Sequence, residues 1–226
     1  MRQEGELAGT HEGEPGLPRG RSGLPAGEVR EAQRERLLRA VIAAVDTAGF
    51  RNVTVADIVR GARVSRAAFY AHFADKEDCF LSATRDGARL MSSRMASAAQ
   101  AVPPGAPDDQ VLRAGLSGFL QFLADESAYA RVLFVEMPTA GPAAVERFDA
   151  ANHRIAEMNR KWHRRARTRH PEWPSVPDAA YEALPGASTE LIRPIVRAGQ
   201  TDSLPGLEET LMSLHMAVLA GRPWTA

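Results

Sequence analysis

The side chains best suited to binding chemistry lie close together in one short stretch of the sequence. Ser65, Arg66 and Tyr70 fall on the polar side of one short predicted helix, and Lys76 stands in the first turn of the next. Arginine side chains donate hydrogen bonds to the edge of guanine, and hydroxyl groups form hydrogen bonds with several bases. A lysine beside a helix N-terminus can hold a phosphate. This chemistry is that of nucleic-acid recognition, provided that local structure holds the four side chains in place.

Two short helices joined by a tight turn are predicted to position these residues. Thr54 is a good N-cap for the first helix, which ends near Gly61, and Ser65 is a good N-cap for the second. Phe69 on the opposite side of the second helix can anchor it in a core. A longer amphipathic helix that stops at Gly49 precedes the pair. This order is the local pattern of a helix-turn-helix.

The stretch Thr54–Phe80 resembles the DNA-binding domain of TetR-family transcriptional regulators. It contains, in the family's order, the capped short helix, an Ala-x-Val-Ser turn, a Phe-Tyr pair, His-Phe and Asp-Lys-Glu. The resemblance covers about residues 30–95, and the C-terminal half matches only in helix count and amphipathicity. It implies an all-α fold, with an N-terminal three-helix DNA-binding domain that contains the helix-turn-helix. A larger helical ligand-binding and dimerisation domain would follow.

The resemblance also assigns roles to individual residues. Arg66 is expected to read bases directly, and its neighbours to position the protein on the DNA backbone. Arg63 stands where the family usually has glycine, and a positive φ there would cost on the order of 1 kcal/mol. Alternatives remain for Tyr70, which would otherwise pack inside, and for His72, which would otherwise fill the bend between helices. The expected DNA-binding residues are Thr54, Arg63, Ser65, Arg66, Ala67, Tyr70, His72 and Lys76.

The domain organisation is predicted from the composition of each segment and from the Pro and Gly residues that end helices. The leading segment is rich in Gly, Pro and Glu and poor in large apolar residues, which predicts disorder. Arg19 and Arg21 within it suit a DNA-contacting arm, although a solvated tail is the favoured interpretation. The predicted parts are a disordered arm (1–27), the helix-turn-helix domain (28–75), a connecting helix (76–99) and an effector-binding and dimerisation domain (100–226).

Two amphipathic segments near the C-terminal end, Asp178–Ala198 and Leu207–Ala220, have the seam-like spacing of antiparallel helices. The family resemblance implies that they form a four-helix interface in a homodimer, with packing inside one chain as the alternative. The expected interface residues are Leu184, Gly186, Ala187, Leu191, Ile195, Leu207, Leu211, Leu214 and Val218.

The helices between the helix-turn-helix domain and the two C-terminal segments are expected to enclose an effector pocket. Their apolar and aromatic residues suit a small hydrophobic molecule of unknown identity, although each residue taken singly is more often plain core. The basic run Arg160–Arg169 favours a solvated helix end paired with acidic neighbours, with a second nucleic-acid contact or an anionic-effector site as the alternatives. The expected pocket residues are Phe119, Phe122, Phe134, Met137, Phe148, Asn152, Met158 and Trp162.

Composition narrows the function classes. The formal net charge is zero, which argues against a protein that is basic throughout, but residues 28–100 hold 12 Lys and Arg against 9 Asp and Glu. The single cysteine, Cys79, allows no internal disulfide and is expected to be a buried thiol. The longest apolar run, Ala40–Val45, is far shorter than the about 20 residues that span a bilayer. We therefore expect a cytoplasmic protein with no membrane partner.

The sequence thus predicts a ligand-responsive transcriptional regulator. No catalytic or metal-binding motif is found, so we expect no enzyme activity, no cofactor and no metal. A repressor that binds a palindromic double-stranded DNA operator as a homodimer, and is released by a small-molecule effector, is favoured. The alternatives are an all-helical interaction module and a transcriptional activator of the same fold without effector control.

Overall fold

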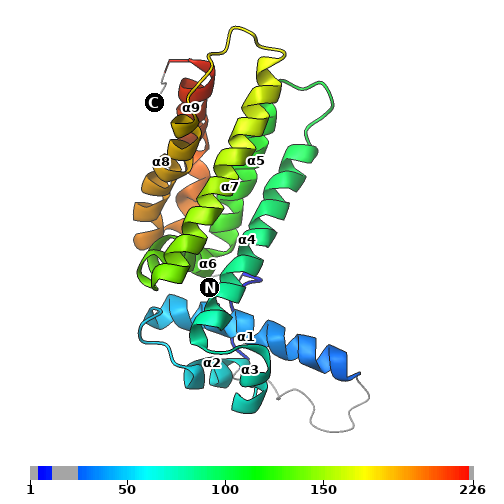
Figure 1. Cartoon of the computed structure of the whole chain (residues 1–226), viewed down its shortest axis with the longest axis vertical. Helices are drawn as coiled ribbons and strands as arrows, with labels where there is room; N and C mark the ends of the chain where they lie inside the picture. Colours follow the sequence, from blue (N-terminus) through cyan, green and yellow to red (C-terminus); the bar gives the residue numbers. More distant parts are fainter. Residues whose placement is uncertain (1–4, 12–24, 224–226) are drawn as a thin grey trace. The chain divides into compact units, whose positions relative to one another are not determined.

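The computed structural model describes residues 5–11 and 25–223, and these residues form helices and no strand (Figure 1). The all-α prediction is confirmed. The chain divides into two compact units. Unit 1 contains the described residues up to Gly87 together with Asp125–Ala144, and unit 2 contains Ala88–Ala124 and the described residues from Val145 onward. Helix α4 contributes residues to both units.

Unit 1 is built on the long helix α1, whose Leu37, Val41 and Val45 are completely buried. Gly49, with a φ of 78°, ends α1 as the sequence predicts. Helices α2 and α3 both pack against α1. The elements of this unit are α1 (Ala26–Ala48), α2 (Val55–Ala62), α3 (Arg66–His72), the first part of α4 (Lys76–Gln100), α6 (Ser127–Arg131), the π-helical η1 (Val132–Glu136) and the 3-10 turn η2 (Met137–Thr139).

The division into units differs from the predicted domain boundaries, because residues 125–144 belong with the DNA-binding helices. Tyr129 of α6 is fully buried, and its hydroxyl donates a hydrogen bond to the Thr84 carbonyl of α4 at 2.9 Å. Gly87 makes this packing possible, since a Cβ there would lie 2.2 Å from the Tyr129 ring. Gly87 thus permits the close packing of Tyr129 on α4, and residue periodicity does not show this.

Residues 5–11 do not follow the prediction of a disordered leading segment. The Glu6 and Leu7 backbone amides donate to the Glu126 carboxylate, and Ala8 is buried. A composition poor in large apolar residues does not rule out a segment whose order comes from backbone hydrogen bonds. Arg19 and Arg21, proposed from the sequence as a DNA-contacting arm, lie outside the described residues.

Unit 2 is a bundle in which α5, α7, α8 and α9 run side by side (Figure 1). Its core includes Ala156, Tyr181, Leu184 and Leu219 from three of these helices. The indole of Trp162 donates to the Asp108 carbonyl at 3.2 Å and joins α7 to α5. The elements are the second part of α4 (from Ala88), α5 (Asp108–Asp125), α7 (Pro142–Arg167), α8 (Asp178–Arg197), the 3-10 turn η3 (Thr201–Leu207) and α9 (Glu208–Ala220).

None of the described helices combines the length and the apolar character needed to cross a bilayer.

Candidate nucleic-acid interface

The N-terminus of α2 is held by a reciprocal cap. The Thr54 hydroxyl accepts from the Asp57 amide at 3.3 Å, and the Asp57 carboxylate accepts from the Thr54 amide at 3.0 Å. The hydrogen bonds from Thr54 hold the pKa of the Asp57 carboxyl below its ordinary value, with a smaller contribution from Arg60. The cap predicted at Thr54 is therefore present, and its carboxylate stays ionised at neutral pH.

The turn between α2 and α3 depends on Arg63, which takes the left-handed conformation with φ 53° and ψ 41°. It is the one non-glycine residue with a positive φ in the described part of the chain. The amide of Val64 donates to the Val59 carbonyl at 3.1 Å, and the Ser65 hydroxyl accepts from the Ala68 amide at 3.1 Å. Hydrogen bonds on both sides of Arg63 thus hold the turn closed despite its strain.

Helix α3 has one fixed side and one open side. Phe69 is fully buried and packs edge-on against the Tyr70 ring. Arg66 and Ala67 are exposed, and Tyr70 is 49% exposed, so the alternative of an internally packed Tyr70 is excluded. The Arg66 guanidinium lies 5.7 Å from the centre of the Tyr70 ring and donates to its hydroxyl at 3.4 Å. An arginine and a tyrosine are thereby presented together on a rigid helix.

His72 ends α3 in a half-buried position. Burial, followed by the charges of Arg30 and Arg34, lowers its pKa below the ordinary value. The imidazole is therefore neutral at pH 7, and any phosphate contact by His72 is a hydrogen bond rather than an ion pair. Arg30 of α1 donates to the Ala71 carbonyl at 3.4 Å, where α3 leaves its last carbonyls without helical partners.

Lys76 is placed differently from the sequence expectation of a phosphate ligand. Its ammonium donates to the carbonyls of Phe50 and Val53, both at 2.8 Å, and lies 4.4 Å from the centre of the Phe50 ring. These contacts join the start of α4 to the loop that precedes α2. Because Lys76 makes two short hydrogen bonds to carbonyl groups and contacts an aromatic ring, its main role in this structure is to stabilise unit 1.

Cys79 is completely buried, and its thiol faces the Leu37 carbonyl at 3.9 Å. Burial is the main cause that raises the pKa of the thiol well above its ordinary range, with a smaller contribution from the neighbouring Asp78. A thiol that does not ionise is a poor nucleophile, so the expected structural role fits its surroundings.

The predicted effector residues do not form one set. Phe134 and Met137 are buried in unit 1, whereas Phe119 and Phe122 are buried in unit 2. Met158 was expected to line the pocket, but it is 45% exposed. The other three predicted residues lie on α7 in unit 2 and are half-buried: Phe148, Asn152 and Trp162. Helical periodicity assigned faces correctly to long stretches but did not show which unit each face belongs to.

Sequence reasoning missed two buried polar residues one helical turn apart on α7. Asn159 is 8% exposed, and no acceptor for its amide nitrogen is found among the described residues. His163 is completely buried, and its Nδ1 lies 2.8 Å from the Tyr181 hydroxyl. Burial is the main cause that lowers the pKa of His163. Polar residues that interrupt the apolar side of a helix were the sequence signal that could have revealed them.

The predicted dimer residues fall into two groups. Leu184 and Leu211 are buried in the core of unit 2, so their assignment to an interface is wrong for this fold. Gly186 is exposed, and a Cβ added there would meet none of the described atoms within 4 Å. The remaining residues are half-buried within the single chain and keep part of their surface accessible: Ala187, Leu191, Ile195, Leu207, Leu214 and Val218.

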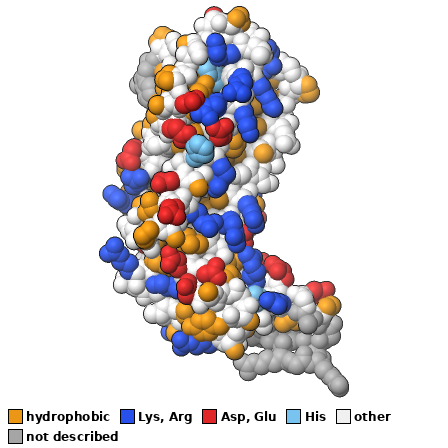
Figure 2. Space-filling view, in the orientation of Figure 1, with side chains coloured by type: hydrophobic (Ala, Val, Ile, Leu, Met, Phe, Trp, Pro, Cys, Tyr) orange, Lys and Arg blue, Asp and Glu red, His pale blue; other side chains and the backbone are white. Residues whose placement is uncertain are grey.

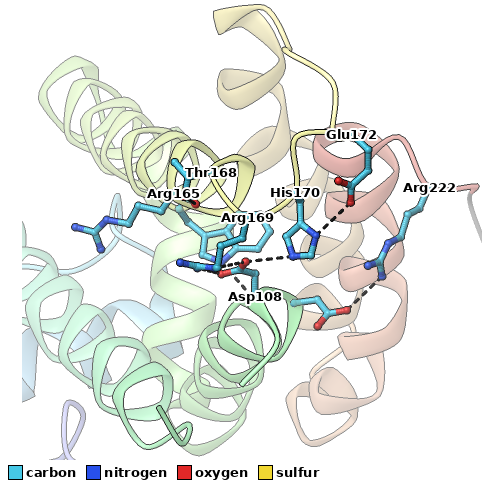
Figure 3. A network of polar contacts seen from close by, with 9 residues as sticks. Asp108, Arg165, Thr168, Arg169, His170, Glu172 and Arg222 are labelled. Atoms are coloured by element: carbon cyan, nitrogen blue, oxygen red, sulfur yellow. Dashed lines mark hydrogen bonds and ion pairs between the residues drawn. The ribbon is translucent and has the colours of Figure 1, made fainter. Parts of the chain in front are cut away.

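Two arginines of the basic run at the end of α7, Arg160 and Arg169, are paired with acidic groups. Figure 2 shows Lys and Arg side chains gathered on unit 2 beside Asp and Glu side chains. In Figure 3, Arg169 and His170 both point toward Asp108 at the start of α5, with Arg169 Nε at 3.0 Å and His170 Nε2 at 3.3 Å from its carboxylate. His170 also stacks on Trp173 at 4.6 Å. The run therefore joins α7 to α5.

Comparison with known proteins supports the DNA-binding assignment. Residues 37–83 match the family model described as bacterial regulatory proteins, tetR family. The chain is 31% identical over 115 residues to the HTH-type transcriptional regulator EthR of Mycolicibacterium smegmatis (strain ATCC 700084 / mc(2)155). That match covers 50% of this chain and 51% of EthR, so the chain spans about half the length of this curated relative.

Solved structures resemble the chain over most of its length. The fatty acid degradation regulator FadR of Bacillus halodurans has a TM-score of 0.73 at 14% identity, covering 85% of this chain and 97% of that one. FadR of Bacillus subtilis, solved in complex with stearoyl-CoA, has a TM-score of 0.71 at 16% sequence identity, and the match covers 83% of this chain and 98% of that one. A TetR-like transcriptional regulator of Rhodococcus sp. RHA1 has a TM-score of 0.64 at 24% sequence identity, and the match covers 88% of this chain and 100% of that one. These likenesses establish a shared fold.

The contacts of Lys76 predict a loss of stability in Lys76→Met. Because the variant leaves two partly buried carbonyls without a donor, we expect its free energy of unfolding to fall by about 1–3 kcal/mol. Urea denaturation measures this. Lys161→Met, at the other lysine of the chain, lies on an exposed part of α7 and is the matched control. Equal stability of the two variants would contradict the structural role of Lys76.

Proposed function

We propose that this chain, whose residues 37–83 match the family model of tetR-family bacterial regulatory proteins, is a ligand-responsive repressor acting in the cytoplasm. In this proposal a homodimer binds a palindromic double-stranded DNA operator and releases it when a small hydrophobic effector binds. One observation carries the DNA-binding role: α3 presents Arg66 and Tyr70 to solvent while Phe69 fixes its other side. A helix so arranged can enter a major groove without reorganisation.

Direct contacts to bases are few in this proposal. Arg66 is the long cationic side chain at the start of α3, and Ala67 beside it can make only apolar contacts, such as those to a thymine methyl group. Thr54, Ser65, Tyr70 and His72 are proposed to position the helix on the DNA backbone. Specificity then requires two half-sites, spaced by about one turn of DNA, that a two-fold dimer reads together.

Arg66→Ala tests the reading role. We expect affinity for duplex DNA from upstream of the protein's own gene to fall about 10- to 100-fold, because one good arginine–guanine contact is lost. The melting temperature should stay nearly unchanged, since the Arg66 side chain is exposed. Fluorescence anisotropy at fixed salt gives the affinity, with a random duplex of equal length as control.

Unchanged specific affinity in Arg66→Ala would remove Arg66 from the reading role. Absence of specific binding by the wild-type protein to this region and to neighbouring promoters would favour the interaction module instead. Transcription from the bound promoter should rise when the gene is deleted, and a fall would identify an activator.

The homodimer is proposed to form through the accessible stripe of α8 and α9. Leu191 and Ile195 on α8, with Leu214 and Val218 on α9, are half-buried apolar residues four positions apart on their helices. Such stripes pack well against a symmetry-related copy. A dimer also doubles the basic excess of the DNA-binding region.

Leu191→Arg is expected to shift the protein from dimer to monomer, because a charge would be buried in the interface. Sedimentation velocity measures the change. Ala179→Arg, at an exposed position in the first turn of the same helix, should remain dimeric. A dimer that survives Leu191→Arg would place the interface elsewhere.

The effector is proposed to be a long-chain acyl compound that binds in unit 2. Support comes from the shared fold with the Bacillus subtilis regulator solved with stearoyl-CoA. Support also comes from the buried aromatic residues Phe119 and Phe122 and from Asn159, whose buried amide nitrogen lacks an acceptor among the described residues. An acyl carbonyl would supply that acceptor, and binding would shift the spacing of the two DNA-binding units.

Stearoyl-CoA is therefore expected to release the protein from its upstream duplex, and Asn159→Leu to reduce that response about tenfold, the value of one buried hydrogen bond. Asn159→Leu should be as stable as the wild type, because it removes an unsatisfied buried amide. Anisotropy titration with stearoyl-CoA, and with coenzyme A alone as control, measures the release. Equal response in both proteins would exclude Asn159 from the effector site.

A further inference from the structure

Residues 5–11 form a short strap that is tied to unit 1 at three points, on α6, α1 and α2. At one end the Glu126 carboxylate accepts from the Glu6 amide at 2.7 Å and from the Leu7 amide at 3.0 Å. Glu126 is 4% exposed. Hydrogen bonds to a buried charged acceptor are stronger than neutral ones, so this end of the strap is firmly held.

The position of Glu126 makes these contacts unusual. It is the N-cap residue of α6, yet its side chain makes no capping hydrogen bond to α6. The carboxylate instead uses one oxygen for each of two strap amides. A residue placed to cap its own helix therefore serves a segment about 120 positions earlier in the sequence.

Glycines in the strap allow its close approach. A Cβ on Gly5 would lie 2.1 Å from the Glu126 carboxylate, and a Cβ on Gly9 would lie 2.9 Å from the Arg39 guanidinium. Arg39 of α1 also donates to the Ala8 carbonyl at 3.4 Å, and Ala8 is 8% exposed. The sequence Gly5–Gly9 is thus matched to the surface beneath it.

The other end of the strap reaches the helix-turn-helix. The His11 amide donates to the Gly61 carbonyl at 2.8 Å, in the last turn of α2 and two residues before the strained Arg63. The final carbonyls of a helix lack partners within the helix. The strap supplies one donor where α2 ends and the turn to the recognition helix begins.

We propose that this strap sets the orientation of α2 and α3 for DNA binding, with Glu126 as its positioning residue. The strap links α6 to α2 across α1, so it limits how far the helix-turn-helix can tilt on α1. The proposal rests on the DNA-binding function proposed above. Loss of the strap leaves the core of unit 1 intact but permits more orientations of α3, and specific affinity falls while nonspecific affinity does not.

Gly5→Ala in the full chain tests the proposal, because its methyl group would collide with the Glu126 carboxylate. Gly27→Ala is the matched control, since a Cβ there meets none of the described atoms within 4 Å. We expect Gly5→Ala to bind the upstream duplex about tenfold more weakly, the effect of losing one strong hydrogen bond, with random-duplex binding unchanged. Amide hydrogen exchange at Glu6, Leu7 and His11 should accelerate in the same variant.

Glu126→Gln is the second variant, because an amide keeps the size of the side chain but accepts only one of the two strap hydrogen bonds. It should show the same split between specific and nonspecific binding, and the double variant with Gly5→Ala should be no weaker than either alone. Additive losses would mean that Glu126 acts apart from the strap.

The outcomes separate this proposal from the proposed function. Glu6 and Leu7 amides that exchange freely in the wild-type protein would overturn the strap, whatever the DNA result. Amides released in Gly5→Ala with unchanged operator affinity would overturn its positioning role. A wild-type protein with protected strap amides and no specific DNA binding would overturn the regulatory function itself.

Discussion

The left-handed conformation of Arg63 is the constraint on which the proposed DNA-binding surface depends. It sets the angle at which α3 leaves α2, and therefore which side of α3 faces outward. For a residue with a Cβ this conformation costs about 1–2 kcal/mol. It persists because the burial of Ile58 in α2 and Phe69 in α3 fixes both sides of the turn. The strain is offset by contacts that form only when the helices are correctly oriented.

Carbonyl groups at the ends of these short helices create a second requirement. Helices of seven and eight residues leave a large share of their carbonyls without internal partners. Donors from distant parts of the chain satisfy two of them, Arg30 at Ala71 and His11 at Gly61, and Lys76 likewise satisfies two carbonyls in the loop before α2. These long-range donors therefore add to the buried core of unit 1, and basic residues such as Arg30 and Lys76 serve this purpose.

This explains what the sequence could and could not predict. Thr54 and Ser65 act on amides three residues away, so local patterns identified both caps. Leu184 and Leu211 lie on apolar stripes, but a stripe does not say whether it faces its own chain or a second copy. The carbonyl contacts of Lys76 could not be predicted, because its acceptors are more than 20 positions earlier. Glu126 gave no local signal, since its partners are the backbone amides of a glycine-flanked segment about 120 residues away.

The net charge of zero also has to be interpreted from the contacts of individual charged residues. In unit 2, Arg160 pairs with Glu157 and Asp178, and Arg169 pairs with Asp108, so these two arginines of the basic run are neutralised at short range. In the helix-turn-helix, Arg66 is exposed on α3 and interacts with the ring of an exposed tyrosine rather than with a carboxylate. The position of each cation, rather than the net charge, therefore decides which charges can face DNA in the proposed complex. In the proposed function, specificity then depends on the rigidity with which α3 carries Arg66.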